Sequence, residues 1–213
     1  MAETSALPGD PAQRPRAIVI STGKRGHDIK GIGVAEHLGL EPEVRTVRLS
    51  PPWSWIAPRG RPPLPPGLQG PPWPDLVFAS GRRTIPLARA LKRQLGSSVF
   101  VTIFDDPGPS PDEFDLVWTS LHDDVAGDTI LRTLTAPHRL TAHGLATEGA
   151  ALAARLGLDP GDAPILGVVL GGPSKVYRFG EARGHGLPRS LPACSARAGP
   201  AFSWPGRAAH RRT

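Results

Sequence analysis

The chain alternates between short apolar runs and segments whose apolar residues recur at helical spacing. Short, mostly apolar runs are typical of strands buried inside a parallel sheet. These runs predict strands at Arg16–Ser21, Asp75–Ser80, Ser98–Phe104 and Asp115–Ser120. Apolar and polar residues alternate in Val44–Leu49, which predicts a further strand nearer an edge of the sheet. Helices are predicted over residues 29–38, 85–95 and 142–156. The alternation of strand and helix predicts an α/β fold of five or six strands, a Rossmann-like parallel sheet with flanking helices.

The turn after the first predicted strand combines glycines with basic residues and a histidine, in the order Gly23, Lys24, Arg25, Gly26, His27. It lies at the carboxyl end of a strand, which is the edge of such sheets where ligands bind. The turn has neither the GxxxxGK[ST] nor the GxGxxG pattern of nucleotide-binding loops. Gly23, Lys24 and Gly26 therefore either line a ligand site or form a tight turn that uses the backbone freedom of glycine.

Two arginines follow the third predicted strand. Arg82 and Arg83 are expected in the first turn of the helix over residues 85–95, where free N–H groups and the helix dipole favour a negative charge. Two cations at that end are unfavourable without an anionic partner. Arg82 and Arg83 therefore bind either an anionic ligand or an internal carboxylate, such as that of Asp105 or Asp106.

Acidic residues follow two of the predicted strands, as Asp105-Asp106 and as His122-Asp123-Asp124. Acids and a histidine at the carboxyl ends of strands are the groups of an acid–base site or of a metal site. The spacing matches no metal-binding signature, and aspartate is also common in turns. We therefore predict no metal site, with acid–base chemistry and turn formation as the two alternatives.

The segment Pro51–Pro74 is dense in proline and cannot form a regular helix or a central strand. We predict that it is a long crossover between two strands of the sheet. Its tryptophans, Trp53, Trp55 and Trp73, either line a groove or anchor the crossover on the body of the domain. Anchoring is the simpler interpretation.

A further apolar run, Ile165–Leu170, predicts another buried strand. It ends at Gly171 and Gly172, which are followed by Ser174 and Lys175. A glycine turn beside a hydroxyl and a lysine can present backbone N–H groups to an anion. These four residues are therefore predicted to bind a phosphate or another anionic ligand.

Charge is distributed unevenly along the chain. The 213 residues carry 25 basic and 19 acidic side chains, but residues 182–213 hold six arginines and no acid. The body is therefore neutral, and the tail supplies the whole net charge of +6. A basic tail on a neutral body is a weak signal of nucleic-acid binding. We expect a solvated tail and no specific nucleic-acid partner.

The single cysteine, Cys194, excludes an internal disulfide and fits a reducing cytosol. No apolar run approaches the roughly 20 residues of a transmembrane helix. Residues 1–15 are polar and rich in proline, without the apolar core of a signal peptide, and they are predicted to be a disordered leader. These features together predict a cytoplasmic protein.

Several motifs follow one another in order along the chain. They are STGKRGH after the first strand, PPWSW and PPWPDLVFASGRRTIPLARALKR in the middle, then VTIFDDP, FDLVWTSLHDDV, LTAPHRLT and LGGPSKVYRF. In these motifs the chain resembles the mitochondrial-fission Elm family and its bacterial relatives, over about residues 17–180. One departure is Asp105-Asp106-Pro107, which stands where the family pattern has a glutamine before a single DP.

Members of that family are similar to glycosyltransferases of the GT-B type, in which two Rossmann-like domains face each other across a cleft. The resemblance implies that Gly23, Lys24, Gly26 and His27 line the cleft from the acceptor-side, N-terminal domain. It also implies that LGGPSK begins the second domain, with its glycines near the diphosphate of a nucleotide-sugar donor. His27 would then activate an acceptor hydroxyl as a base, and Lys175 would stabilise the departing diphosphate. The ligand would be a nucleotide-sugar substrate, and no cofactor is expected.

These segments predict the domain organisation. Residues 1–15 are a leader, residues 16–160 a Rossmann-like N-terminal domain, residues 164–180 the start of a second domain and residues 181–213 a disordered basic tail. The tail shows neither strand nor helix periodicity and has the composition of an out-of-frame message from a GC-rich bacterial gene. We therefore expect a truncated or frameshifted chain that keeps the acceptor-side domain and is inactive alone.

The alternative is a non-catalytic interaction module. The tryptophan-containing crossover and the basic tail would then bind a protein partner or an anionic surface. The plant member of the Elm family is associated with organelle fission, in which a dynamin-like GTPase is recruited, and that role would apply only to a eukaryotic protein. The sequence identifies neither the sugar, nor the acceptor, nor the partner.

Overall fold

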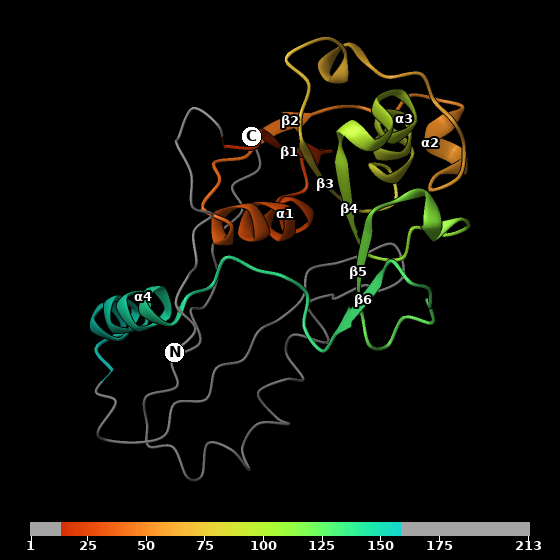
Figure 1. Cartoon of the computed structure of the whole chain (residues 1–213). Coiled ribbons are helices and arrows are strands. Elements are labelled where there is room, and N and C mark those ends of the chain that lie inside the picture. Colours follow the sequence, from red (N-terminus) through yellow and green to blue (C-terminus); the bar gives the residue numbers. More distant parts are fainter. Residues whose placement is uncertain (1–13, 159–213) are drawn as a thin grey trace, which may run out of the picture. The chain divides into compact units, whose positions relative to one another are not determined.

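The computed structural model describes residues 14–158. The chain divides into two units, Met1–Thr141 and Ala142–Thr213, which are treated separately below. In the described part of the first unit, six strands form one parallel sheet in the order β2-β1-β3-β4-β5-β6 (Figure 1). This confirms the predicted α/β class and the Rossmann-like parallel sheet with flanking helices.

The strands are β1 (Ala17–Ser21), β2 (Glu43–Thr46), β3 (Leu76–Ser80), β4 (Phe100–Phe104), β5 (Leu116–Ser120) and β6 (Ile130–Thr133). The α-helices are α1 (Arg25–His37), α2 (Trp53–Ile56), α3 (Ile85–Leu95) and α4 (Ala142–Leu156), with short 3-10 turns at Pro66–Leu68, Gly96–Ser98 and Pro111–Glu113. The edge strand β6 and the single turn α2 lie in segments to which the hydrophobic pattern assigns no element.

The direction of the strand order changes at β1. From β1 the chain passes through α1 to β2 on one side, and it then crosses back through residues 47–75 to β3 on the other side. In a doubly wound sheet, ligands bind in the crevice beyond the carboxyl ends of two strands related in this way. The switch point between β1 and β3 is therefore the expected place for a site in this unit.

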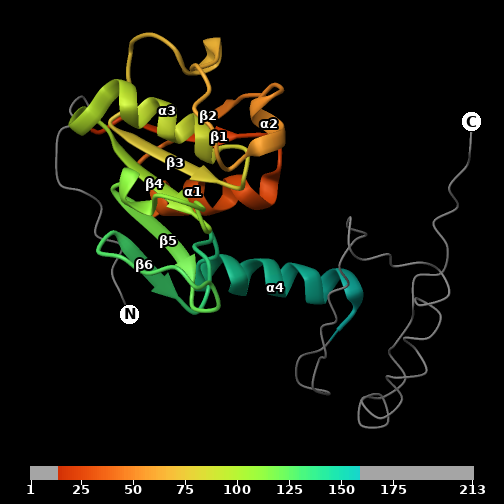
Figure 2. The same ribbon diagram turned by 90° about the vertical axis from the view of Figure 1, so that its right-hand side faces the viewer.

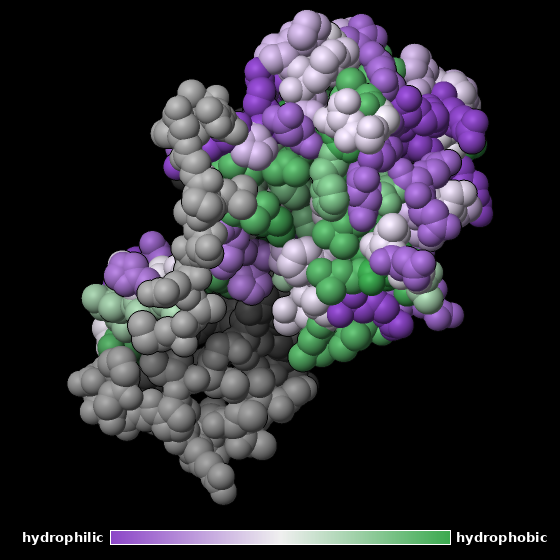
Figure 3. All heavy atoms as spheres, viewed as in Figure 1, coloured by the Kyte–Doolittle hydropathy of each residue, from purple (hydrophilic) through white to green (hydrophobic). Residues whose placement is uncertain are grey.

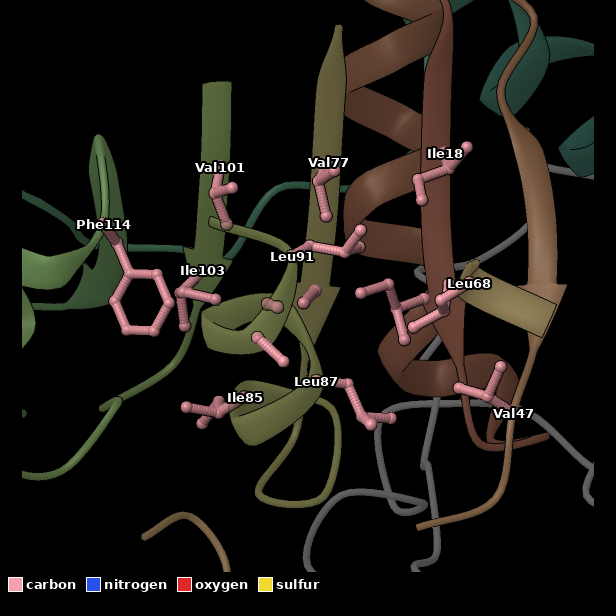
Figure 4. Packing of buried hydrophobic residues seen from close by; sticks show 14 of the residues in the cluster. Ile18, Val47, Leu68, Val77, Ile85, Leu87, Leu91, Val101, Ile103 and Phe114 are labelled. Carbon is pink, nitrogen blue, oxygen red and sulfur yellow. The ribbon is translucent and has the colours of Figure 1, made fainter. Parts of the chain in front are cut away.

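Helices cover opposite faces of the sheet (Figure 2). α1 contacts β1 and β3, whereas α3 contacts β3 and β4. Along β1 the side chains alternate, so Ile18 and Ile20 join the core on the α3 side while Val19 joins the core on the α1 side. The larger core lies beneath α3 (Figure 4), and α3 contributes its apolar stripe of Ile85, Leu87, Ala88 and Leu91.

α1 approaches the sheet through small residues. At Gly31 a Cβ would lie 2.7 Å from Phe78 Cβ, and at Gly33 it would lie 2.6 Å from the backbone carbonyl of His138, which follows β6. Only glycine permits these two approaches. An ion pair between Arg139 and Glu36 ties the same segment to α1. Because glycines make these contacts, α1 shows little of the apolar periodicity that marks α3.

The proline-rich crossover is packed against the body of the unit. Trp53 and Trp73 are partly buried against the core beneath α3, which confirms the predicted anchoring for these two tryptophans. Trp55 is 72% exposed and does not anchor the crossover. The predicted strand Val44–Leu49 is shorter in the structure, because β2 ends at Thr46 while the buried side chains of Val47 and Leu49 belong to the crossover.

Hydrophobic side chains reach the surface around β5 and β6, whereas polar residues cover most of the α2 and α3 side in this view (Figure 3). Leu121, Leu131 and Leu134 are exposed in and around the edge strand β6.

In the second unit, α4 spans Ala142–Leu156 as predicted and is followed by Gly157 with a φ of 63°. The predicted strand Ile165–Leu170 and the basic tail lie outside the described residues. Among the helices of residues 14–158, none is long and apolar enough to cross a membrane.

Candidate functional site

Four polar side chains meet at the carboxyl edge of the sheet, beside the switch point between β1 and β3. His27 and Lys30 lie in the first two turns of α1, which follows β1. Ser80 is the last residue of β3, and Asp105 follows β4 directly. These four residues form the carboxyl-edge cluster, since hydrogen bonds and an ion pair connect them.

Asp105 is the centre of this cluster. Its Oδ2 accepts hydrogen bonds from Ser80 Oγ at 2.8 Å and from the Gly81 N–H at 3.1 Å. Its Oδ1 accepts from Lys30 Nζ in an ion pair. His27 Nδ1 lies 3.2 Å from Ser80 Oγ and 4.0 Å from Asp105 Oδ2. The carboxylate therefore connects the ends of β3 and β4 to the first helix.

The backbone of Asp105 is strained, with a φ of 106°. A residue other than glycine in such a conformation costs of order 1–3 kcal/mol and persists only where its surroundings hold it in place. Here the contacts from Ser80, Gly81 and Lys30 hold the carboxylate. Strain of this kind is found preferentially at functional sites, which makes the cluster a candidate site.

His27 packs directly against the backbone of Gly81. A Cβ on Gly81 would lie 2.5 Å from His27 Nδ1 and 2.7 Å from Cε1, and the φ of Gly81 is 91°. Both the space and the conformation at this position therefore require glycine. The imidazole side chain is still 39% exposed. The ring is thus fixed on one side by the strand end and open on another side to solvent.

The glycine-containing turn predicted as a ligand site leads into this cluster. Gly23 has a φ of 81°, and its N–H donates to Ser21 Oγ at 2.9 Å. Lys24 is the N-cap residue of α1, and a Cβ on Gly26 would meet no atom within 4 Å. The turn therefore uses glycine for its backbone freedom at Gly23, and the space beside Gly26 is open. Whether these residues bind a ligand stays a prediction.

The two arginines after β3 have separate surroundings. Arg82 donates through Nε to the carbonyl of Ala57 and through Nη2 to that of Trp55 at 3.4 Å, so it holds the proline-rich crossover. Arg83 is exposed and makes no ion pair within residues 14–158. The predicted internal partner is wrong, because Asp105 pairs with Lys30 and Asp106 accepts from the Gly108 N–H at 2.7 Å. Both arginines also precede α3, which begins at Ile85 after the N-cap Thr84.

The predicted anion-binding loop of Gly171, Gly172, Ser174 and Lys175 lies outside the described residues. The structure therefore leaves that prediction as it stands. Within residues 14–158, no three His, Cys, Asp or Glu side chains are placed so that they could hold a metal ion. A surface hollow of about 390 Å³ is lined by residues such as Arg16, Gly39 and Glu43. It lies at the amino end of β1, whereas the carboxyl-edge cluster lies at the opposite edge of the sheet.

The turn His122-Asp123-Asp124 has a structural role. Asp123 Oδ2 accepts hydrogen bonds from Thr119 Oγ1 and from the Ser120 N–H, the latter at 3.1 Å. The hydrogen bond from Thr119 is the largest effect and lowers the pKa of the Asp123 carboxyl. Desolvation opposes it, and the hydrogen bond from Ser120 and the nearby charges of His122 and Lys30 lower the pKa further by smaller amounts. Turn formation is therefore the alternative that the geometry supports, and His122 is largely exposed.

Replacing Asp123 by asparagine is expected to make the fold less sensitive to acid. Folding lowers the pKa of Asp123 below about 3.9, the usual pKa of aspartate. The ionised carboxylate therefore stabilises the fold above a pH of about 3.9. This stabilisation is lost as the pH falls through the lower pKa of the folded state. The wild-type chain should therefore lose more stability between about pH 5 and pH 2 than the variant does. Urea unfolding across this range measures the difference, with Asp124→Asn as the exposed control. Equal losses in wild type and Asp123→Asn would contradict the prediction.

Two members of the cluster, Ser80 and Lys30, are not among the residues that the sequence pattern singles out. A weak signal exists for each. Lys30 is three residues after His27 and therefore on the same side of a helix, and Ser80 ends a buried strand directly before a glycine. Their meeting with Asp105 depends on β1, β3 and β4 being adjacent, which the sequence alone does not show.

Comparison with known proteins agrees with the motifs in the sequence. The family model described as Mitochondrial fission ELM1 matches residues 15–203, which is most of the chain. The matched range continues beyond residue 180, where the resemblance in the motifs ends. Searches of curated proteins and of solved structures found no match. The match over most of the sequence shows that the chain belongs to the family described as Mitochondrial fission ELM1.

Proposed function

We propose that the carboxyl edge of this sheet is the acceptor-side half of a glycosyltransferase-like site of the GT-B type. The observation that carries the proposal is the position of His27, a half-exposed imidazole at the switch point between β1 and β3. Two cations at the same edge make no ion pair with any residue of 14–158. This edge is where doubly wound sheets bind ligands. The similarity of the Elm family to GT-B enzymes provides the reaction class.

His27 has the chemistry that such a reaction needs from the acceptor side. A sugar or alcohol hydroxyl is a weak nucleophile until a base removes its proton. In the proposed reaction the acceptor oxygen forms a bond to the anomeric carbon of the donor sugar, while the bond from that carbon to the nucleoside diphosphate breaks. The hydroxyl proton passes to His27, and the bonding electrons leave with the diphosphate. A half-exposed imidazole can accept that proton and later release it to solvent.

Cations beside His27 would attract the negatively charged donor. Lys24 and Arg83 are exposed, and within the part of the chain that the structure describes neither makes an ion pair. Both lie in turns at the carboxyl edge, after β1 and β3 respectively. The resemblance implies that Gly171, Gly172, Ser174 and Lys175 lie on the donor side, and we keep that as part of the proposal. The chain is therefore proposed to bind a nucleotide sugar, and binding is the property to measure first.

Isothermal titration calorimetry with UDP-glucose, GDP-glucose and dTDP-glucose tests this function. Saturable binding of at least one of them is expected. Because exposed ion pairs contribute about 0.2–1 kcal/mol, Lys24→Ala and Arg83→Ala should each weaken that binding about 1.4- to 5-fold. Arg93→Ala provides the matched control, since Arg93 is an exposed cation in the last turn of α3. Flat titrations with all three nucleotide sugars, or equal weakening by the control, would overturn the proposal.

A further inference from the structure

We propose that Ser80 and Asp105 are positioning residues that hold the neutral His27 ring in its Nδ1–H tautomer, which makes Nε2 the proton-accepting atom. The role of this atom as a base rests on the proposed function, but the tautomer itself follows from the hydrogen bonds. In a neutral imidazole one nitrogen carries the hydrogen and the other carries the free electron pair. The hydrogen bond made by one nitrogen therefore decides which nitrogen can accept a proton.

The direction of the hydrogen bonds follows from Asp105. An ionised carboxylate can only accept hydrogen bonds, and the ion pair with Lys30 identifies Asp105 as ionised. Ser80 Oγ lies 2.8 Å from Asp105 Oδ2, so the hydroxyl hydrogen must point to the carboxylate. Otherwise lone pairs of the two oxygens would face each other at hydrogen-bond distance without a hydrogen between them.

The tautomer of His27 follows from this assignment. Ser80 has one hydroxyl hydrogen, and once it is donated to Asp105 the oxygen can only accept from other partners. His27 Nδ1 lies 3.2 Å from that oxygen and must therefore carry the hydrogen of the bond. Nε2 then holds the free electron pair of the ring. Ser80 is buried, so water does not readily offer its hydroxyl a different partner.

The arrangement is also fixed in space. The ring lies on the backbone of Gly81, where a Cβ would approach Nδ1 to 2.5 Å, and the Gly81 N–H donates to the same Oδ2 that accepts from Ser80. Lys30 holds the other carboxylate oxygen from the next turn of α1. Rotation of the Asp105 carboxylate away from Ser80 would therefore break the contacts to Gly81 and Lys30 as well. Ser80 and Asp105 act on the reaction through His27, without contacting substrate in this proposal.

The test is NMR of the full chain labelled with ¹⁵N, using long-range ¹H–¹⁵N correlation of the histidine rings at a pH where His27 is neutral. This experiment separates Nδ1–H, Nε2–H and doubly protonated rings by their nitrogen shifts. We expect Nδ1–H for His27 in the wild-type protein. In Ser80→Ala the restraint is lost, and the Nε2–H form should become populated, whereas Ser80→Thr keeps the hydroxyl and should keep Nδ1–H.

Ser21→Ala is the matched control for this experiment. Ser21 is also the buried last residue of a strand and also bonds a carboxylate, that of Asp28 at 2.8 Å. The other hydrogen bond that its hydroxyl makes within residues 14–158 is accepted from the Gly23 N–H, and His27 is not its partner. The control should leave the tautomer unchanged. An Nε2–H ring in the wild-type protein, or an unchanged tautomer in Ser80→Ala, would overturn the proposal whether or not nucleotide sugars bind. A flat titration with a wild-type Nδ1–H ring would instead overturn only the proposed function.

Discussion

Replacing Phe104 by alanine is expected to lower the free energy of unfolding by about 3–5 kcal/mol, the usual cost of removing a buried phenylalanine. Phe104 is fully buried on the α1 face of the sheet. Its ring lies 6.0 Å from that of Phe78 and 6.1 Å from that of Trp118, in neighbouring strands on either side of β4. The substitution removes the middle of this aromatic row and leaves a cavity between Phe78 and Trp118.

Urea unfolding followed by circular dichroism measures this effect. Phe100→Ala is the matched control, because Phe100 begins the same strand and is 45% exposed. Its replacement should cost roughly 1 kcal/mol or less, in proportion to the smaller area that it buries. If both variants lose the same stability, the buried ring of Phe104 does not stabilise the sheet more than the exposed ring of Phe100, which contradicts the prediction. Since Asp105 follows Phe104 directly, the same variant is also expected to disturb the carboxyl-edge cluster.

Replacing Arg89 by alanine is expected to cost about 3 kcal/mol, at the low end for breaking a buried ion pair because the partner is partly exposed. The Arg89 side chain on α3 is only 6% exposed and pairs through Nε with Glu113. Its Nη1 donates to the Pro58 carbonyl at 2.9 Å, and its guanidinium carbon lies 5.4 Å from the centre of the Phe114 ring. One side chain thus joins α3 to the crossover and to the segment before β5, and the alanine variant would leave these partners unsatisfied.

The control for Arg89 is Arg93→Ala, four residues later on the same helix and exposed to solvent. Surface substitutions of this kind usually change stability by no more than about 0.5 kcal/mol. Unfolding midpoints in urea, with unchanged dependence on denaturant, provide the comparison. A loss at Arg89 as small as that at Arg93 would show that the buried guanidinium contributes no net stability to this unit.

Most of the sheet could be predicted, because buried parallel strands are short apolar runs and four of them stand out in the sequence, while the alternation of Val44–Leu49 indicates a fifth strand. The elements that were harder to predict lack that signal. Helix α1 begins at Arg25, four residues before Ile29, since its first turn is polar and its buried face consists of small residues such as Gly31 and Gly33. The edge strand β6 is only partly buried, and hydrophobic alternation is weak where one side of a strand faces solvent.

The candidate site was predicted in part for a similar reason. His27 and the glycine turns follow strands, so the general rule for parallel sheets was enough to select them. The sequence does not show which strands are neighbours, and the contact between His27, Ser80 and Asp105 depends on that order. Arg82 was expected at an anion, but the crossover offers it the carbonyls of Ala57 and Trp55. Tertiary neighbours therefore decided its partner.

The close approach of α1 to the segment after β6 also determines the order in which this unit can be completed during synthesis. Arg139 and Glu36 are separated by 103 residues, and the backbone of His138 covers Gly33. During synthesis, α1 is therefore made before the segment His138–Arg139 that contacts it, which comes at the end of the first unit. Contacts this distant in sequence slow folding, since a long loop must close before they stabilise anything. A nascent chain that stops before residue 138 would expose one side of α1 to other nascent chains and to chaperones.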